Sequence, residues 1–241
     1  MTIHISKTEL LYKKSKPIDH LSIGKGITLM VNEQKDAAMA VKNVTDFLEL
    51  AINQIYERLM LHNEGRLIYA GAGTSGRIGV QDGVELFPTF NWPKERLDFI
   101  IAGGINALIN AVENAEDDSA AAEAACDALT IGPDDCLMAV GASGRTPYTI
   151  ASVIRARQRG ALTIGISNNP DTRLLRVADI SICLDTGAEA LAGSTRLAAG
   201  TAQKICLNLL STQVMVMLGR EPLANGLDVK IARRVRLPTA F

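Results

Sequence analysis

Three short segments of this chain combine glycine with serine and threonine hydroxyls, a chemistry suited to binding phosphate. They read GAGTSGR from Gly71, GASGRTP from Gly141 and GSTR from Gly193. Glycines let the backbone approach a ligand and hydroxyls donate hydrogen bonds. A helix that follows adds free N–H groups and a partial positive charge. Three such segments in one chain predict a binding site for a phosphorylated small molecule.

Each segment also has a purely structural explanation. A hydroxyl before a helix is a common N-cap, and Thr146 followed by Pro147 fits that role. The first segment matches the dinucleotide-binding pattern G-x-G-x-x-G, but no well-placed acidic residue follows about 20 positions later to bind a ribose. It is not a nucleotide P-loop either, because the lysine of that motif is missing. Ser143 and Gly144 have no capping role. Because the three segments coincide, we favour a ligand site.

Three carboxylates accompany these segments and could move protons or orient substrate hydroxyls. Glu85 lies one to two helical turns after the first segment, between Val84 and Leu86. This apolar setting predicts a raised pKa, which suits proton transfer. Glu113 follows a predicted strand, and Glu189 precedes the third segment, where it could orient substrate hydroxyls. Spacing alone does not distinguish such functional acids from ordinary solvent-exposed acids on a helix.

The elements that must position these residues alternate between strand and helix. Apolar runs predict strands over 66–70, 97–102, 136–140, 162–167 and 180–184, and helical periodicity predicts helices over 76–86, 105–112, 119–129, 146–159 and 194–218, with a short one after Pro170. This alternation predicts an α/β fold, a doubly wound parallel sheet flanked by helices. Ligands of such sheets bind at the carboxyl ends of the strands, where the three hydroxyl segments fall.

The ends of the chain are simpler. Residues 1–24 are polar and irregular and predict an N-terminal arm that wraps a neighbouring surface or a partner subunit. A helical lead-in over 25–61 and a short C-terminal tail over 219–241 complete one domain that spans 25–241.

Composition narrows the class of protein. The chain has 241 residues, a net charge of −1 and 4% aromatic residues, and it lacks a long basic run, so we expect no nucleic-acid partner. It has no apolar stretch of about 18 residues and no signal-peptide pattern, so we expect no membrane partner and a cytoplasmic location. The four cysteines match no zinc motif, and Cys136 and Cys183 are predicted to be buried free thiols.

At the hydroxyl segments and carboxylates the sequence resembles a known family. GAGTSGRIGVQDGVELFPTF, AVENAEDD, GASGRTPY and GSTRLAAGTAQKICLNLLST resemble the N-acetylmuramic acid 6-phosphate etherases, members of the sugar isomerase (SIS) family of phosphosugar-binding domains. The resemblance runs from about Gly65 to Asp228. It implies a SIS-type, flavodoxin-like three-layer fold, a homodimer with the site near the subunit interface, and no metal or organic cofactor.

The implied reaction is cleavage of the D-lactyl ether of N-acetylmuramic acid 6-phosphate, a lyase step of amino-sugar catabolism and peptidoglycan recycling. The resemblance makes Glu85 the catalytic acid/base and Glu113 its catalytic partner. The candidate substrate-binding residues are Gly73, Thr74, Ser75, Gly76, Ser143, Gly144, Arg145, Thr146, Glu189, Ser194 and Thr195.

The sequence departs from the family pattern at a few positions. Val84 stands where the family has a serine beside the acid, Ala198 stands where it has a lysine, and the family's small helical C-terminal region does not follow. Two alternatives therefore stay open: a sugar-phosphate isomerase that uses the same proton abstraction, and a non-catalytic phosphosugar-binding regulator. Retention of both Glu85 and Glu113 favours an enzyme, because a regulator needs no proton-transfer pair.

Overall fold

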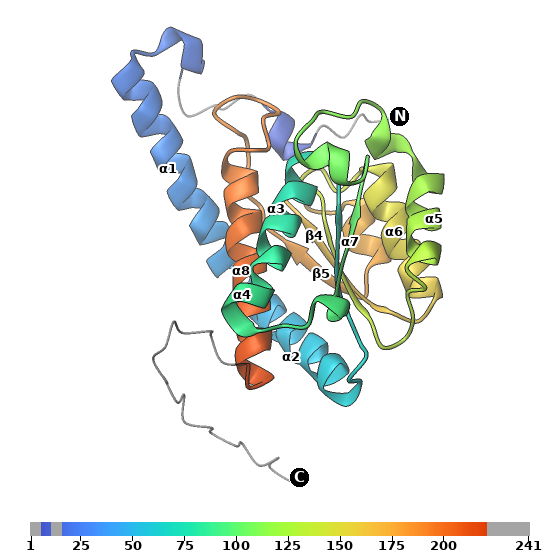
Figure 1. Ribbon diagram of the computed structural model, residues 1–241. Coiled ribbons are helices and arrows are strands. Elements are labelled where there is room, and N and C mark those ends of the chain that lie inside the picture. Colours follow the sequence, from blue (N-terminus) through green and yellow to red (C-terminus); the bar gives the residue numbers. More distant parts are fainter. Residues whose placement is uncertain (1–5, 11–15, 221–241) are drawn as a thin grey trace.

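The computed structural model describes residues 6–10 and 16–220, and at its centre is a parallel five-stranded β-sheet (Figure 1). The strands are β1 (Leu67–Gly71), β2 (Leu97–Ile101), β3 (Cys136–Val140), β4 (Leu162–Ser167) and β5 (Ile180–Cys183), in the order β2-β1-β3-β4-β5. All neighbouring strands pair in parallel. The predicted α/β fold with its parallel sheet is confirmed.

Both faces of the sheet are covered, because successive strand side chains point to opposite faces. In β1, Leu67 and Tyr69 belong to one apolar cluster and Ile68 and Ala70 to the other. The first cluster is covered by α1 (Ile23–Lys42), α2 (Thr45–Leu61), α3 (Gly73–Val84), α4 (Leu86–Phe90) and α8 (Ala198–Met217). The second is covered by α5 (Ser119–Ala128), α6 (Pro147–Gln158) and α7 (Arg173–Val177). The result is a three-layer arrangement (Figure 1).

The ends of the chain differ in part from the prediction. The helical lead-in is present as α1 and α2, but α1 already begins at Ile23. The N-terminal arm contains short 3₁₀ turns at Lys7–Glu9 and Ile18–His20. Residues 6–10 of this arm pack against their own chain. The tail predicted over 219–241 lies outside the described residues beyond Arg220.

One predicted helix is wrong. Over 105–112 the structure has only a 3₁₀ turn, Ile105–Leu108, followed by irregular chain. The Arg77 guanidinium donates hydrogen bonds to the carbonyls of Ala107 (3.0 Å) and Asn110 (3.0 Å). In an α-helix those carbonyls would accept from N–H groups four residues later. Arg77 therefore ties this loop to α3 in a non-helical form.

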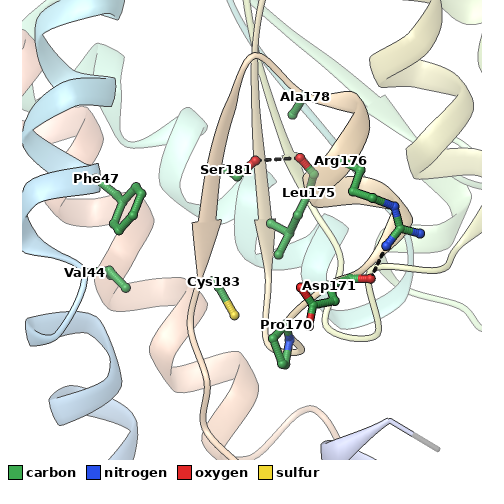
Figure 2. A pocket seen from close by; sticks show the side chains of 9 residues that line it. All are labelled: Val44, Phe47, Pro170, Asp171, Leu175, Arg176, Ala178, Ser181 and Cys183. Atoms are coloured by element: carbon green, nitrogen blue, oxygen red, sulfur yellow. Dashed lines mark hydrogen bonds between the residues drawn. The ribbon is translucent and has the colours of Figure 1, made fainter. Parts of the chain in front are cut away.

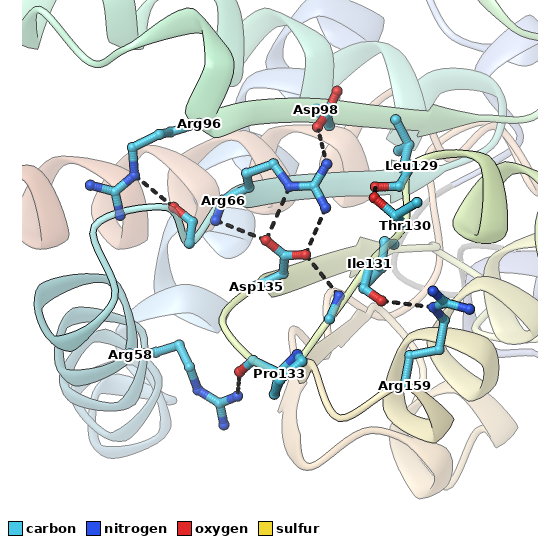
Figure 3. A network of polar contacts seen from close by, with 12 residues as sticks. Arg58, Arg66, Arg96, Asp98, Leu129, Thr130, Ile131, Pro133, Asp135 and Arg159 are labelled. Carbon is cyan, nitrogen blue, oxygen red and sulfur yellow. Dashed lines mark hydrogen bonds and ion pairs between the residues drawn. The ribbon is translucent and has the colours of Figure 1, made fainter.

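The amino edge of the sheet is fixed by a network of ions and carbonyls (Figure 3). Asp135, which is buried, accepts hydrogen bonds from Arg66 Nη2 (2.8 Å) and from the Gly132 N–H (2.9 Å). Arg66 also pairs with Asp98 at 3.0 Å. Since Arg66, Asp98 and Asp135 lie at the starts of β1, β2 and β3, the network fixes how these three strands begin.

The four cysteines, Cys126, Cys136, Cys183 and Cys206, are all free thiols. The predicted burial is confirmed for Cys136, whose thiol pKa burial raises to about 12. It is wrong for Cys183, which is partly exposed, because the end of edge strand β5 has a neighbouring strand on one side only.

Within residues 6–10 and 16–220, no helix combines the length and apolar character needed to span a bilayer.

Candidate active site

The structure brings the three hydroxyl segments together at the carboxyl edge of the sheet. The first follows β1 and the second follows β3, adjacent strands at which the winding of the sheet changes direction (Figure 1). Open α/β sheets bind ligands at this switch point. The third segment precedes α8, which packs on α3: a Cβ added to Gly200 would lie 3.6 Å from Thr74 Cγ2 and 3.2 Å from the Thr195 carbonyl oxygen. The three segments therefore border one region.

The hydroxyls of the first segment are not helix caps. Because α3 begins at Gly73, Thr74, Ser75 and Gly76 form its first turn, three residues earlier than predicted. The N-cap position is Ala72, and no side chain caps this helix. Ser75 is buried, and neither its hydroxyl nor that of Thr74 forms a hydrogen bond within the described residues. The unpaired N–H groups of this turn suit an anion.

The second segment presents a similar helix start. Thr146 occupies the N-cap position of α6 with Pro147 after it, but its side chain makes no capping hydrogen bond. The Ser143 hydroxyl accepts a hydrogen bond from the Arg145 backbone N–H at 3.2 Å, and the Arg145 side chain is exposed. The start of α6 therefore offers free N–H groups at the same edge of the sheet as those of α3.

Gly144 is required by the shape of the second segment. Its φ is +61°, a conformation that costs other residues about 1–2 kcal/mol. A Cβ at this position would also lie 2.5 Å from Thr172 Cβ and 2.6 Å from Ser167 Oγ. Only glycine fits between these side chains.

The third segment differs from its prediction. The long helix begins at Ala198 rather than at Ser194, so Ser194 and Thr195 lie in the preceding loop and do not cap α8. The cap comes from Glu189, which is 0% exposed: its two carboxylate oxygens accept hydrogen bonds from the N–H groups of Ala198 and Ala199, both at 2.9 Å. Burial raises the pKa of Glu189, and these two N–H groups partly lower it. Both oxygens of Glu189 are thus already used by the helix.

A further buried acid, Glu33 on α1, lies beside Glu189 and was missed by the sequence reasoning. It is 2% exposed, and neither carboxyl oxygen has a hydrogen-bond partner of good geometry in the described part of the chain. Burial, followed by repulsion from the Glu189 carboxylate, raises the pKa of Glu33 to about 7. The available signal was its helical spacing from Ala37 and Val41, which places an acid on the buried face of α1.

The two predicted catalytic carboxylates are not brought together within one chain. Glu85 follows the last residue of α3, whose 12 residues span about 18 Å, and so lies far from the first hydroxyl segment. Glu113 lies in the connection from β2 to α5, at the carboxyl edge. Both side chains are exposed. The first segment and Glu113 are therefore on one side of the molecule, and Glu85 is on the other.

The predicted apolar burial of Glu85 is wrong for the single chain. Its neighbours Val84 and Phe87 are themselves 48% and 40% exposed, so they shield it little from water. The buried acid of this stretch is Asp82, which accepts hydrogen bonds from Tyr69 Oη (2.6 Å) and Asn208 Nδ2 (2.6 Å). Asp82 thereby fixes α3 to β1 and α8.

A cavity of about 520 Å³ lies elsewhere, between α2 and the edge strand β5 (Figure 2). Its lining residues are Val44, Phe47, Pro170, Asp171, Leu175, Arg176, Ala178, Ser181 and Cys183. None of the candidate site residues is among them. The part of the chain that the structure describes also holds no group of three or more metal-ligating side chains.

Two family profiles match the sequence. The glucokinase regulatory protein N-terminal SIS domain matches residues 51–157, and the SIS domain matches residues 111–213. Among curated proteins, the N-acetylmuramic acid 6-phosphate etherase of Deinococcus radiodurans is 48% identical over 89% of this chain and 70% of its own length. The N-acetylmuramic acid 6-phosphate etherase of Pasteurella multocida is 42% identical over 90% of this chain and 72% of its own length.

Solved structures share the fold. A phosphoheptose isomerase from Francisella tularensis superposes with a TM-score of 0.60 at 20% identity, covering 80% of this chain and 98% of the isomerase chain. The Vibrio vulnificus NanR protein complexed with ManNAc-6P superposes with a TM-score of 0.52 at 16% identity, covering 82% of this chain and 65% of NanR.

Proposed function

The chain belongs to the family of N-acetylmuramic acid 6-phosphate etherases, and from that membership we propose how its site works. The enzyme is a carbon–oxygen lyase that cleaves the D-lactyl ether of N-acetylmuramic acid 6-phosphate. The products are N-acetylglucosamine 6-phosphate and D-lactate. The observation that carries the proposal is the meeting of the hydroxyl segments at the β1/β3 switch point, where the N-termini of α3 and α6 lack side-chain caps.

The phosphate binds at these two helix starts. Thr74 and Ser75 donate from the first turn of α3, while Ser143, Gly144 and Thr146 surround the start of α6. The N-terminus of α8 is excluded from this role, because Glu189 already accepts hydrogen bonds from its N–H groups and would repel a phosphate. Ser194 and Thr195, in the loop before α8, are left to bind sugar hydroxyls.

The chemistry is proton transfer between carboxyl groups and the open-chain sugar. One carboxylate removes the C2 proton of the aldehyde, and the other protonates the ether oxygen as the C3–O bond breaks and lactate leaves. Water then adds across the unsaturated aldehyde, giving its hydroxyl to C3 and a proton to C2. Glu85 and Glu113 share these two roles, and the reaction needs no metal or organic cofactor.

Glu85 lies at the C-terminal end of α3, and Glu113 lies at the carboxyl edge of the sheet, where α3 begins. We therefore assign them to one site in a homodimer, with Glu85 from one chain and Glu113 from the other. The exposed apolar side chains of Val84 and Phe87 support this arrangement, since an interface there would cover them and bury Glu85. A cytoplasmic location is part of the same proposal. Four free cysteines are typical of a reducing compartment.

The reaction is tested in deuterated water. Purified protein, treated with a chelator, is incubated with N-acetylmuramic acid 6-phosphate, and the products are analysed by mass spectrometry. Release of lactate with deuterium at C2 of the product is expected. Deuterium exchange at C2 without lactate would identify an isomerase, and binding with neither would identify a phosphosugar-binding regulator.

The shared site is tested by mixing two inactive variants. Glu85→Gln and Glu113→Gln should each abolish turnover while phosphosugar binding stays nearly intact. When the two are unfolded and refolded together, about half of the dimers are mixed, and each mixed dimer has one intact site. We expect about a quarter of the wild-type activity to return. No recovery would place both carboxylates in the same chain.

A further inference from the structure

The N-terminal strap, residues Ser6–Leu10, lies on the carboxyl edge of the sheet against two of the hydroxyl segments. It forms one 3₁₀ turn, and its Ser6 and Thr8 are only 3% and 1% exposed. This burial is unusual for two polar residues. The contacts of Thr8 account for it.

Thr8 joins the loops that follow β3 and β4 to the third hydroxyl segment. Its hydroxyl accepts a hydrogen bond from Asn169 Nδ2 at 3.1 Å, and the same Nδ2 donates to the Ala142 carbonyl at 2.9 Å. The Thr8 carbonyl accepts from the Gly193 N–H at 2.9 Å. Ala142 belongs to the second segment and Gly193 to the third, so the pair Thr8 and Asn169 connects these two segments directly.

Other contacts of the strap strengthen the same connection. The Lys7 backbone N–H donates to Asn169 Oδ1 at 2.6 Å, so both ends of the Asn169 amide are held. The Lys7 ammonium pairs with Asp185, which lies in the connection that leads to the third segment. By contrast, the Ser6 hydroxyl is buried and has no partner among the described residues.

We propose that Thr8 is a positioning residue for phosphosugar binding, which holds the third hydroxyl segment at a fixed distance from the second. The inference rests on the proposed function of these segments. Without the Thr8 hydroxyl, Asn169 Nδ2 keeps one acceptor instead of two, and the strap loses a buried side-chain contact. Ser194 and Thr195 then keep their chemistry but lose their fixed position. The effect falls on substrate affinity and leaves the proton-transfer groups untouched.

The test compares three variants of the full chain. Thr8→Val keeps the shape and removes the hydroxyl, Thr8→Ser restores it, and Thr28→Val is the matched control. The Thr28 hydroxyl donates to the Gly24 carbonyl at 2.8 Å on the exposed side of α1, away from the strap. For Thr8→Val we expect KM for N-acetylmuramic acid 6-phosphate to rise about tenfold with kcat within twofold of wild type, in line with loss of one buried hydrogen bond. Thr8→Ser should recover most of the affinity, and Thr28→Val should match wild type.

Amide hydrogen exchange provides a measurement that does not depend on the reaction. In Thr8→Val the amides of residues 190–197 should exchange faster than in wild type, while those of β1 and β3 stay unchanged. Unchanged exchange over 190–197, or a fall in kcat with unchanged KM, would overturn the inference. If wild type itself neither binds nor converts the substrate, the proposed function fails, and the exchange result still decides whether Thr8 positions the third segment.

Discussion

Glu189→Gln tests whether this acid holds α8 or binds substrate. In the structure Glu189 is fully buried, and each of its carboxylate oxygens accepts one backbone N–H at 2.9 Å. Glutamine has nearly the same volume and keeps one oxygen. Its amide nitrogen must then face an N–H group, so a donor meets a donor and one buried N–H of α8 loses its acceptor.

The cost follows from three contributions. A hydrogen bond to a charged group contributes about 1.5–3 kcal/mol, and a buried N–H left without a partner costs about 1–3 kcal/mol. These two overlap, because they concern the same N–H. Relief of charge burial opposes them, since burial raises the pKa of Glu189. We expect a net loss of about 2–4 kcal/mol in the free energy of unfolding, or roughly 5–15 °C in Tm for a chain of this size.

The assay is urea unfolding followed by far-UV circular dichroism, with Glu116→Gln as the control, because Glu116 is exposed on a surface turn. The control should unfold like wild type. A loss below about 0.5 kcal/mol for Glu189→Gln, together with a large rise in KM, would refute the reasoning. Glu189 would then be a substrate-binding residue, as its sequence position first suggested.

Three further substitutions test other parts of the structure. Glu33→Gln should raise the free energy of unfolding by about 1–2 kcal/mol at pH 8 and change it little near pH 4.5. The pKa of Glu33 is raised from 4.5 to about 7 in the folded chain, so the stability present below pH 4.5 is lost as pH rises through 7. Glutamine carries no charge and keeps that stability at pH 8. Thermal unfolding across that range measures it, and a gain independent of pH would contradict the titration. Asp135→Ala should lower the free energy of unfolding, measured by chemical denaturation, by about 3–5 kcal/mol, because half-buried Arg66 loses its closest partner. As a control, Asp127→Ala removes an exposed ion pair and should leave the unfolding midpoint nearly unchanged. Gly144→Ala should lower the free energy of unfolding by about 2–4 kcal/mol, because the residue has a positive φ and the added Cβ would clash with Thr172. It should also weaken phosphosugar binding. If the variant were as stable as wild type, the second segment could shift without cost.

The sequence predicted the sheet well because its strands are short apolar runs bounded by turns. Each of the five runs became a strand, and only their ends moved by a residue. The segment 105–112 failed for a reason that no local pattern contains. Its carbonyls are taken by Arg77, which is about 30 residues away in the chain and reaches them only after α3 has packed on β1.

The positions of the candidate site's loops could be predicted from the sequence, and the surroundings of its acids could not. Clusters of glycine and hydroxyl residues between a strand and a helix can be recognised from the local sequence, and the fold then brings them to one edge of the sheet. The environment of an acid depends instead on tertiary contacts. Two apolar sequence neighbours of Glu85, Val84 and Phe87, face solvent, and Glu33 looks like an ordinary helix acid although it is buried in the folded chain. Thr8 could not be linked to Asn169 from sequence, because 161 positions separate them.

The ionic network of Arg66, Asp98 and Asp135 lies at the opposite edge of the sheet from the hydroxyl segments. Because of this separation, the sequence of the hydroxyl segments can change independently of the network. Substitutions in the hydroxyl segments do not touch the contacts that begin the strands, so the scaffold can stay the same while these loops change. Val84 and Ala198 are departures from the family pattern that this scaffold accommodates. Changes in the loops at the carboxyl edge therefore leave the contacts that begin the strands in place.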